Sequence, residues 1–280
     1  MKIVIIAGMH RSGTSVVTQW LNKCGLQTGV YNLGPSSSNL DGHFEDTEFV
    51  RLHEDVLTDN ELPETGLTEH PIRYISDYNR LRFEYLFQLK NEFFDQWGWK
   101  DPRNCLFLRY YKNNYPQAKY LFIFRDYKSV VSSLIIREFK EVEQKYSSRN
   151  FCSRFVWKTF RKKKQFEKLC HNKVDFYLKI WIAYNEQIIN IIPVLDNKNY
   201  ILLSYSLLHT KDNEVYNYLC ENWMLDLDYV PFSRVFKSDR ISTVIDVDNY
   251  IANRLLFEKA RILERQFQTE ILVQNFNLYA

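Results

Sequence analysis

The sequence predicts an α/β fold with three layers, in which helices cover both faces of a central parallel β-sheet. One observation is the opening run Lys2 to Ala7 (KIVIIA), which is short, rich in β-branched residues and followed by Gly8. Such a run is typical of a buried strand. The other is that the succession of strand, turn and helix recurs farther along the chain. Strands that alternate with helices favour a parallel sheet with both faces covered.

The first 100 residues contain one such unit and two more helices. After the opening strand, residues 16–21 carry apolar side chains at helical spacing, which predicts a helix directly behind a tight turn. Helical patterns also predict helices at 46–57 and 77–94. The segment 59–71 between them is acidic and contains two prolines, so it is predicted as a loop.

The unit of strand, turn and helix recurs twice after residue 119. Residues 120–124 (YLFIF) predict a buried strand and 128–136 a helix, and residues 200–203 (YILL) and 212–222 predict the next pair. With 280 residues and 45% hydrophobic content, the chain can bury a large core. We therefore expect a single domain spanning residues 1–280.

A C-terminal helical segment is expected at about 249–276. Five apolar residues fall on one stripe at helical spacing: Ile251, Leu255, Ala260, Leu263 and Phe267. A stripe of this kind favours a helix that docks on the rest of the chain or pairs with a second copy. The sequence therefore leaves a homodimer open.

Composition limits the class of protein. A formal charge of +3 is too small to indicate a nucleic-acid-binding protein. The five cysteines are widely spaced without a CxxC pair, and the six histidines lack metal-ligand spacing, so we expect neither a disulfide framework nor a metal site. The first apolar run is too short for a signal peptide, and no other run has the length of a transmembrane segment, which predicts a cytoplasmic protein.

Residues 8–15 (GMHRSGTS) form a candidate phosphate loop. They lie between the first strand and its helix, where backbone N–H groups and the helix dipole favour an anion. The spacing is that of a Walker loop, except that Thr14 stands where the lysine belongs. A kinase needs that lysine and Mg²⁺ on its triphosphate. Here the cation lies inside the loop, at Arg11, which suits a less charged donor such as a phosphosulfate.

The run Arg11-Ser12-Gly13-Thr14-Ser15 resembles the sulfotransferase family, in which Lys or Arg followed by Ser-Gly-Thr before a helix binds a 5′-phosphosulfate. The resemblance implies the P-loop NTPase-like sulfotransferase fold and 3′-phosphoadenosine 5′-phosphosulfate (PAPS) as co-substrate, with no metal expected. The residues expected to bind the donor are His10, Arg11, Ser12, Gly13, Thr14 and Ser15. The alternative is a glycine-containing turn that only connects strand to helix.

Arg125 and Ser133 form a second candidate site. In the family, an arginine at a strand end and a serine eight residues later bind the 3′-phosphate of PAPS, and these two residues have that spacing. Ser132 could take the place of Ser133, but it points about 100° away around the helix. The alternative is that Arg125 pairs with Asp126 and that Ser133 is a buried polar residue of the helix.

Sulfuryl transfer needs a cation for the leaving phosphate and a base for the acceptor hydroxyl. Arg11 is the candidate cation. In the segment 41–45 (DGHFE), which resembles a pattern of bacterial members of the family, Glu45 is the first candidate for the base and His43 the second. The alternative is helix capping, because Glu45 and Asp46 lie at a predicted helix N-terminus.

Two weaker features complete the set. Lys100-Asp101-Pro102-Arg103 resembles a family element between a strand and a helix, so Lys100, Asp101 and Arg103 are candidates for the substrate cleft. An N-cap at Asp101 with Pro102 in the first turn is the alternative. The segment 150–173 mixes aromatic and basic residues, which fits a solvated helix face or a contact for an anionic glycan or membrane surface.

These features predict a PAPS-dependent sulfotransferase that acts on a hydroxyl of a small-molecule or glycan acceptor, for which a saccharide or glycoconjugate is preferred. Two alternatives remain: a P-loop nucleotide or small-molecule kinase, and a nucleotide-binding module without catalysis. Nucleic acid is not an expected partner.

Overall fold

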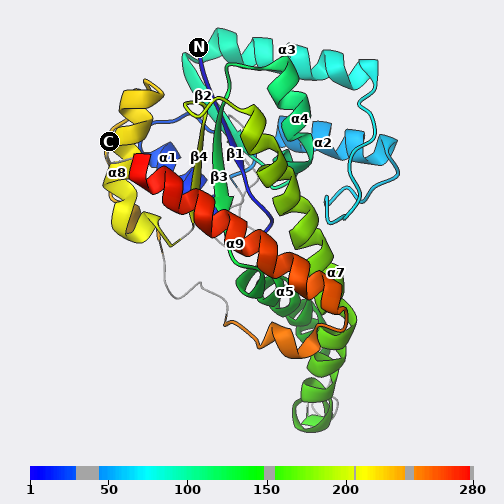
Figure 1. The fold of residues 1–280 in the computed structure, drawn as a ribbon. Coiled ribbons are helices and arrows are strands. Elements are labelled where there is room, and N and C mark those ends of the chain that lie inside the picture. Colours follow the sequence, from blue (N-terminus) through cyan, green and yellow to red (C-terminus); the bar gives the residue numbers. More distant parts are fainter. Residues whose placement is uncertain (30–43, 148–154, 205, 237–242, 278–280) are drawn as a thin grey trace.

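The structure, a computed structural model, describes residues 1–29, 44–147, 155–204, 206–236 and 243–277 (Figure 1). Within them, one parallel sheet has the strand order β2-β1-β3-β4. Its strands are β1 (Lys2–Ala7), β2 (Gln96–Lys100), β3 (Lys119–Phe124) and β4 (Tyr200–Ser204).

Helices connect the strands and extend beyond them. The α-helices are α1 (Thr14–Lys23), α2 (Thr47–Asp59), α3 (Asp77–Phe93), α4 (Asn104–Asn114), α5 (Tyr127–Ser147), α7 (Lys162–Ile191), α8 (Leu208–Asn222) and α9 (Arg254–Asn277). Shorter turns are the π-helix Trp157–Arg161 and the 3-10 helices Ile192–Val194, Phe232–Arg234 and Val247–Tyr250.

The sheet is covered on both faces, which confirms the predicted three-layer α/β fold. Along β3, Phe122 and Phe124 point into a core shared with α2–α5, α7 and α9, whereas Leu121 and Ile123 point into a second core with α1 and α8. Side chains alternate between the faces of a strand, so a strand with two buried faces needs an unbroken apolar run. This explains the unbroken apolar run YLFIF in β3.

The predicted elements have the right type, but two of them are longer than expected. Helix α5 continues to Ser147, beyond the predicted end at residue 136. Helix α7 runs for 30 residues through to Ile191, whereas the sequence indicated a helical face only up to Lys173. Together the two helices build an arm that extends away from the sheet (Figure 1).

Strand β1 is the switch point of the sheet. It pairs with β2 on one side and with β3 on the other, and Ala7 is in register with Phe122. In open parallel sheets, ligands bind at the carboxyl ends of the strands at such a point. The loop after β1 and the residues after β3 therefore emerge side by side.

The apolar stripe predicted for the C-terminus is partly wrong. Helix α9 begins at Arg254, so Ile251 precedes it. Leu255 is 82% exposed, because the first turn of α9 leaves this side chain on the outer face. Helical spacing alone placed Leu255 on the stripe. A helix buries an apolar face, however, only along the part that another element covers.

The rest of the stripe docks on the same chain. Ala260, Leu263 and Phe267 are buried, and the Phe267 ring stacks on Phe124 with centroids 4.3 Å apart. The side-chain oxygen of Gln274 accepts a hydrogen bond from the backbone N–H of Leu202 in the edge strand β4 (2.6 Å). The apolar face of α9 therefore packs against the same chain. A homodimer stays a prediction.

One substitution at two positions of α9 tests this docking. Leu263→Ala is expected to lower the free energy of unfolding by about 2–5 kcal/mol, because it opens a cavity in the core. Leu255→Ala on the exposed face should change it by less than about 0.5 kcal/mol. Urea denaturation measures both variants. Equal effects would contradict the observed orientation of the helix.

Candidate functional site

The loop after β1 is held close to β3 in a conformation that few residues adopt. A Cβ atom at Gly8 would lie 2.5 Å from the carbonyl oxygen of Ile123, so the loop approaches β3 this closely only with glycine there. Arg11 and Gly13 have φ angles of 69° and 90°. For Arg11 the left-handed conformation costs about 1–2 kcal/mol, and such strain is often found at functional sites.

Helix α1 begins in this loop without a side-chain cap. Asp46 caps α2 and Ser76 caps α3 by accepting hydrogen bonds from backbone N–H groups. At α1 the N-cap is Gly13, and the first turn contains no acidic residue. The first N–H groups of a helix need acceptors, and an anion satisfies them well. The turn at Thr14 and Ser15 therefore fits the predicted phosphate loop.

The structure brings the two predicted phosphate elements together. The Nε of Arg11 donates a hydrogen bond to Oγ of Ser133 (2.9 Å), and a guanidinium nitrogen of Arg125 donates to the backbone oxygen of Arg11 (2.9 Å). Ser132 faces elsewhere and accepts from the N–H of Ile245 (3.1 Å). Of the two serines considered, Ser133 is therefore the one beside the loop.

Asp126 has a local role that does not depend on Arg125. Its side chain accepts a hydrogen bond from the backbone N–H of Ser129 (2.8 Å) at the start of α5. Arg125, in turn, donates a hydrogen bond to the loop, and Asp126 caps the start of α5.

Positive charge is concentrated around the loop. Burial, followed by the charges of Arg137 and Arg125, lowers the pKa of Arg11. Three guanidinium groups that disfavour one another are a good setting for an anion, because an anion relieves their repulsion. Arg137 is one helical turn beyond Ser133 on α5, so both residues point the same way.

His10 offers a neutral imidazole at the same place. Burial, and then the charge of Arg103, lowers its pKa to about 3, so the ring is uncharged at pH 7. Its Nε2 is buried and has no hydrogen-bond partner among the residues that the structure describes. A buried ring nitrogen without a partner costs free energy. A bound ligand could supply the missing partner.

Glu45 is paired with Lys100 beneath the loop. The Nζ of Lys100 donates a hydrogen bond to Oε1 of Glu45 (2.6 Å), and both side chains are almost fully buried. Burial raises the pKa of Glu45, and Lys100 opposes part of that effect. Asp46, which also binds Lys90, is the cap of α2. The capping alternative thus applies to Asp46 and not to Glu45, which stays a candidate for the base. The other candidate, His43, lies outside the described residues.

Asp101 and Arg103 belong to a buried ionic network. Asp101 accepts hydrogen bonds from the backbone N–H and Nε of Arg103 and contacts Nδ1 of His53 (2.8 Å). Burial alone would raise the pKa of Asp101, but Arg103 and His53 lower it well below its usual range. Arg103 also binds Glu54 (2.9 Å). Helix α4 starts at Asn104, so Asp101 closes the preceding turn rather than serving as N-cap.

These contacts leave Asp101 few hydrogen-bonding sites for a substrate. The exposed fractions of Lys100, Asp101 and Arg103 are 1%, 0% and 6%. Their charges nevertheless act on the pKa of His10. A position at the base of the cleft thus stays a prediction for Lys100, Asp101 and Arg103.

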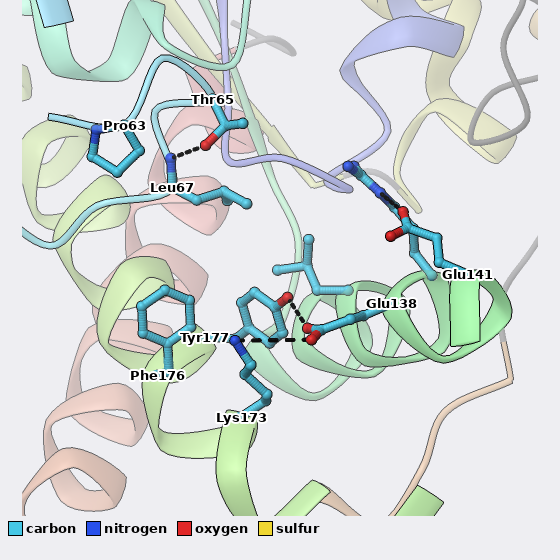
Figure 2. Close-up of a pocket in the computed structure, with 10 residues that line it drawn as sticks. Pro63, Thr65, Leu67, Glu138, Glu141, Lys173, Phe176 and Tyr177 are labelled. Atoms are coloured by element: carbon cyan, nitrogen blue, oxygen red, sulfur yellow. Dashed lines mark hydrogen bonds and ion pairs between the residues drawn. The ribbon is translucent and has the colours of Figure 1, made fainter. Parts of the chain in front are cut away.

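A pocket of about 390 Å³ lies between the 63–67 loop and the helices α5 and α7 (Figure 2). Its lining is Pro63, Thr65, Leu67, Leu134, Arg137, Glu138, Glu141, Lys173, Phe176 and Tyr177. Tyr177 donates a hydrogen bond to Glu138 (2.6 Å), and Lys173 lies 3.8 Å from the same carboxylate. Arg137 lines the pocket, and its charge contributes to the lowered pKa of Arg11, so the pocket lies near the candidate donor site. This pocket was not predicted from the sequence. The signal that could have indicated it is the i, i+4 spacing that places Arg137 on the same face of α5 as Ser133.

Comparison with known proteins identifies the family. A family model described as the sulfotransferase family matches residues 4–189, from the first strand to the end of α7. The chain belongs to the sulfotransferase family. No curated protein matches the chain.

Solved structures show the same fold. The chain is similar to a sulfotransferase from Alicyclobacillus acidocaldarius, with a TM-score of 0.51, 13% identity and coverage of 96% of each chain. A sulfotransferase from Mycobacterium tuberculosis has a TM-score of 0.51 and 12% identity, with coverage of 92% of this chain and 76% of that one. At these identities the likeness concerns the fold alone. Within the described residues, no helix has the length and hydropathy needed to span a membrane.

The buried pair of Lys100 and Glu45 gives a prediction for stability. Lys100→Met leaves a buried carboxylate without its cation and is expected to cost about 3–5 kcal/mol at pH 7. The pKa of Glu45 then rises further, so the folded state binds its proton more tightly than the unfolded state does. Stability therefore falls as pH rises from about 4.3, the ordinary Glu value, through the raised pKa.

Urea denaturation between pH 5 and 8 measures this loss. The double variant Lys100→Met/Glu45→Gln should recover much of it, and Lys23→Met, at an exposed lysine of α1, is the control. A loss of stability that is the same at pH 5 and pH 8 would show that Glu45 is not the group left unpaired.

Proposed function

We propose that this member of the sulfotransferase family transfers a sulfuryl group from PAPS to a hydroxyl of an acceptor. Family membership supports sulfotransferase activity. That the donor is PAPS is the part that we propose. The observation that carries it is the contact of Arg11 with Ser133 and of Arg125 with the backbone of Arg11, which joins two phosphate elements 114 residues or more apart in sequence.

The loop and the start of α5 would divide the donor between them. The uncapped N–H groups of α1, with the hydroxyls of Ser12, Thr14 and Ser15, suit the 5′-phosphosulfate. Arg125 and Ser133 suit a 3′-phosphate, for which charge-assisted hydrogen bonds are worth about 1.5–3 kcal/mol each. His10 has an unsatisfied ring nitrogen toward a ligand, and Gly13 lets the backbone approach it.

The chemistry needs one base and one cation. The acceptor oxygen forms a bond to sulfur while the bond between sulfur and the bridging phosphate oxygen breaks, and that oxygen leaves with the electron pair. Glu45, whose pKa is raised by burial, takes the hydroxyl proton. Arg11 neutralises the charge that develops on the leaving phosphate. Lys100 holds the Glu45 carboxylate in place.

The acceptor would be a saccharide or glycoconjugate held in the pocket of Figure 2. Its two cations, Arg137 and Lys173, are balanced by Glu138 and Glu141, so a net-charged ligand gains nothing overall. Phe176 offers an apolar ring, over which the ammonium of Lys173 lies 5.1 Å from the centroid, while the charged groups can bind hydroxyls. This combination supports an uncharged polyol. A cytoplasmic location stays a prediction, as does the absence of a metal.

Donor preference tests the proposal against a kinase and a non-catalytic module. We expect 3′,5′-phosphoadenosine to bind far more tightly than ATP, because Arg125 and Ser133 contact a group that ATP lacks. Arg125→Ala should weaken this binding by about 2 kcal/mol or more, roughly 30-fold. Ser133→Ala should also weaken it, whereas the neighbouring Ser132→Ala should not.

Isothermal titration calorimetry measures each affinity, and thermal melting without ligand reports the fold. Equal affinity for ATP that Mg²⁺ strengthens would support the kinase instead. Tight binding of PAPS without release of sulfate or transfer to any acceptor would support the binding module.

Glu45→Gln separates a base from a structural partner of Lys100. Gln keeps the shape and a hydrogen-bond acceptor but not the basic carboxylate, so turnover should fall roughly 10²–10⁴-fold with donor affinity nearly unchanged. Because the pKa of Glu45 is raised, the rate of the unmodified chain should fall as pH drops through that pKa. The variant should lack this dependence.

Release of sulfate from PAPS to water provides the readout without a known acceptor. His43→Ala is the companion variant. If Glu45→Gln leaves the rate unchanged and His43→Ala abolishes it, His43 is the base.

A further inference from the structure

The arm built by α5 and α7 extends far from the sheet (Figure 1). Residues 155–168, which comprise the π-helix and the first residues of α7, form what we call the arm tip. None of the candidate donor residues lies in it. Its composition differs sharply from that of the rest of the chain.

The arm tip is the most basic part of the described chain. It contains a single acidic residue, Glu167, and six basic ones: Lys158, Arg161, Lys162, Lys163, Lys164 and Lys168. Six positive charges and one negative give the tip a formal charge of +5, while the whole chain has +3. All six basic residues are exposed. Lys162 pairs with Glu143 of α5 (2.5 Å), which leaves most of this charge facing solvent.

Apolar side chains are exposed beside these charges. Phe155, Val156 and Phe160 are 58%, 39% and 71% exposed. Between them, Trp157 is buried and stacks on Tyr146 of α5 with centroids 4.0 Å apart. The turn is therefore anchored to the arm while two phenyl rings point outward. The tip therefore combines exposed phenyl rings with basic side chains on one short segment.

The π-helical geometry contributes to this arrangement. A π-helix is rare, and single π-turns occur often at functional sites. Here it spans Trp157–Arg161, so the buried anchor and the exposed Phe160 lie in the same turn.

We propose that the arm tip docks on a lipid surface that contains anionic headgroups. Clusters of four to eight Lys and Arg residues attract anionic lipids, and exposed aromatic rings insert into the boundary between headgroups and acyl chains. An anionic glycan would use the charge but would leave Phe155 and Phe160 in water. The apolar side chains are the reason to choose the lipid surface.

Two different variants separate the parts of this contact. Phe155→Ser/Phe160→Ser removes the inserting rings, and Lys163→Glu/Lys164→Glu reverses two charges. The matched controls lie elsewhere on the surface: Tyr78→Ser/Tyr85→Ser on α3, where the rings are 70% and 67% exposed, and Lys23→Glu/Lys198→Glu. Each control removes as many exposed rings or changes the charge as much as its counterpart.

The experiment is co-sedimentation of the full chain with vesicles of phosphatidylcholine alone or with about 30% phosphatidylserine. Binding is expected only with phosphatidylserine, should weaken as salt is raised, and should fall about tenfold or more in each tip variant. The two controls should bind as the unmodified chain does. Thermal melting and affinity for 3′,5′-phosphoadenosine should be unchanged in both tip variants.

Three outcomes would overturn the proposal: no binding to the phosphatidylserine vesicles, equal loss of binding in the controls, or retention on immobilised heparin without vesicle binding. The last outcome would assign the tip to an anionic glycan. Because vesicle binding is measured without turnover, the proposed enzymatic function can fail or succeed independently.

Discussion

Gly8 lies against the carbonyl oxygen of Ile123, and this close approach determines how near the loop after β1 comes to the end of β3. Everything in the candidate site depends on that distance. With the loop against β3, Arg125 can reach the backbone of Arg11, and the side chain of Arg11 can reach Ser133. Any side chain at position 8 would push the loop away and separate the two halves of the candidate donor site.

A layer of buried charge supports the loop from the side of β2. Isolated buried charges are costly, so a network of this kind is retained only where every member has partners. Here its two carboxylates have opposite properties. The pKa of Asp101 is lowered, whereas that of Glu45 is raised by burial. Two acids whose pKa values are driven apart can take different roles. Asp101 stays ionised and orients His53 and Arg103, and Glu45 is the carboxylate suited to take a proton.

The two candidate phosphate elements could be recognised in the sequence because each is a local signal. A strand followed by two glycines, and an arginine eight residues before a serine, lie within short windows. The contact of Lys100 with Glu45 spans 55 residues, and no local pattern pairs those two side chains. The extent of α7 was missed for another reason. Its apolar part, around Tyr177 and Trp181, is rich in aromatic and β-branched residues that favour strands as much as helices.

The misassigned Leu255 shows the limit of periodicity itself. Period 3.6 identifies a face, but only the neighbours decide how much of that face is covered. The same holds for α5, where periodicity predicts the helix at 128–136 but not that it continues into the arm. The last turn of α5 is covered because Trp157 of the π-helix stacks on Tyr146. This contact comes from another helix and leaves no signal in the sequence of α5.

Helix α5 connects the two proposals physically. It begins beside the candidate donor site, carries Ser133, and ends near the arm tip at Ser147. A straight helix rises about 1.5 Å per residue, so Ser133 lies roughly 20 Å from that end. With the arm upright on a lipid surface, the pocket, whose α5 lining runs from Leu134 to Glu141, would stand roughly 10–20 Å above the headgroups. An acceptor hydroxyl on a free sugar could reach the pocket in any orientation, whereas one attached to the membrane would need a headgroup or glycan long enough to span that distance. The length of α5 would then select among membrane-bound acceptors, independently of the side chains that line the pocket.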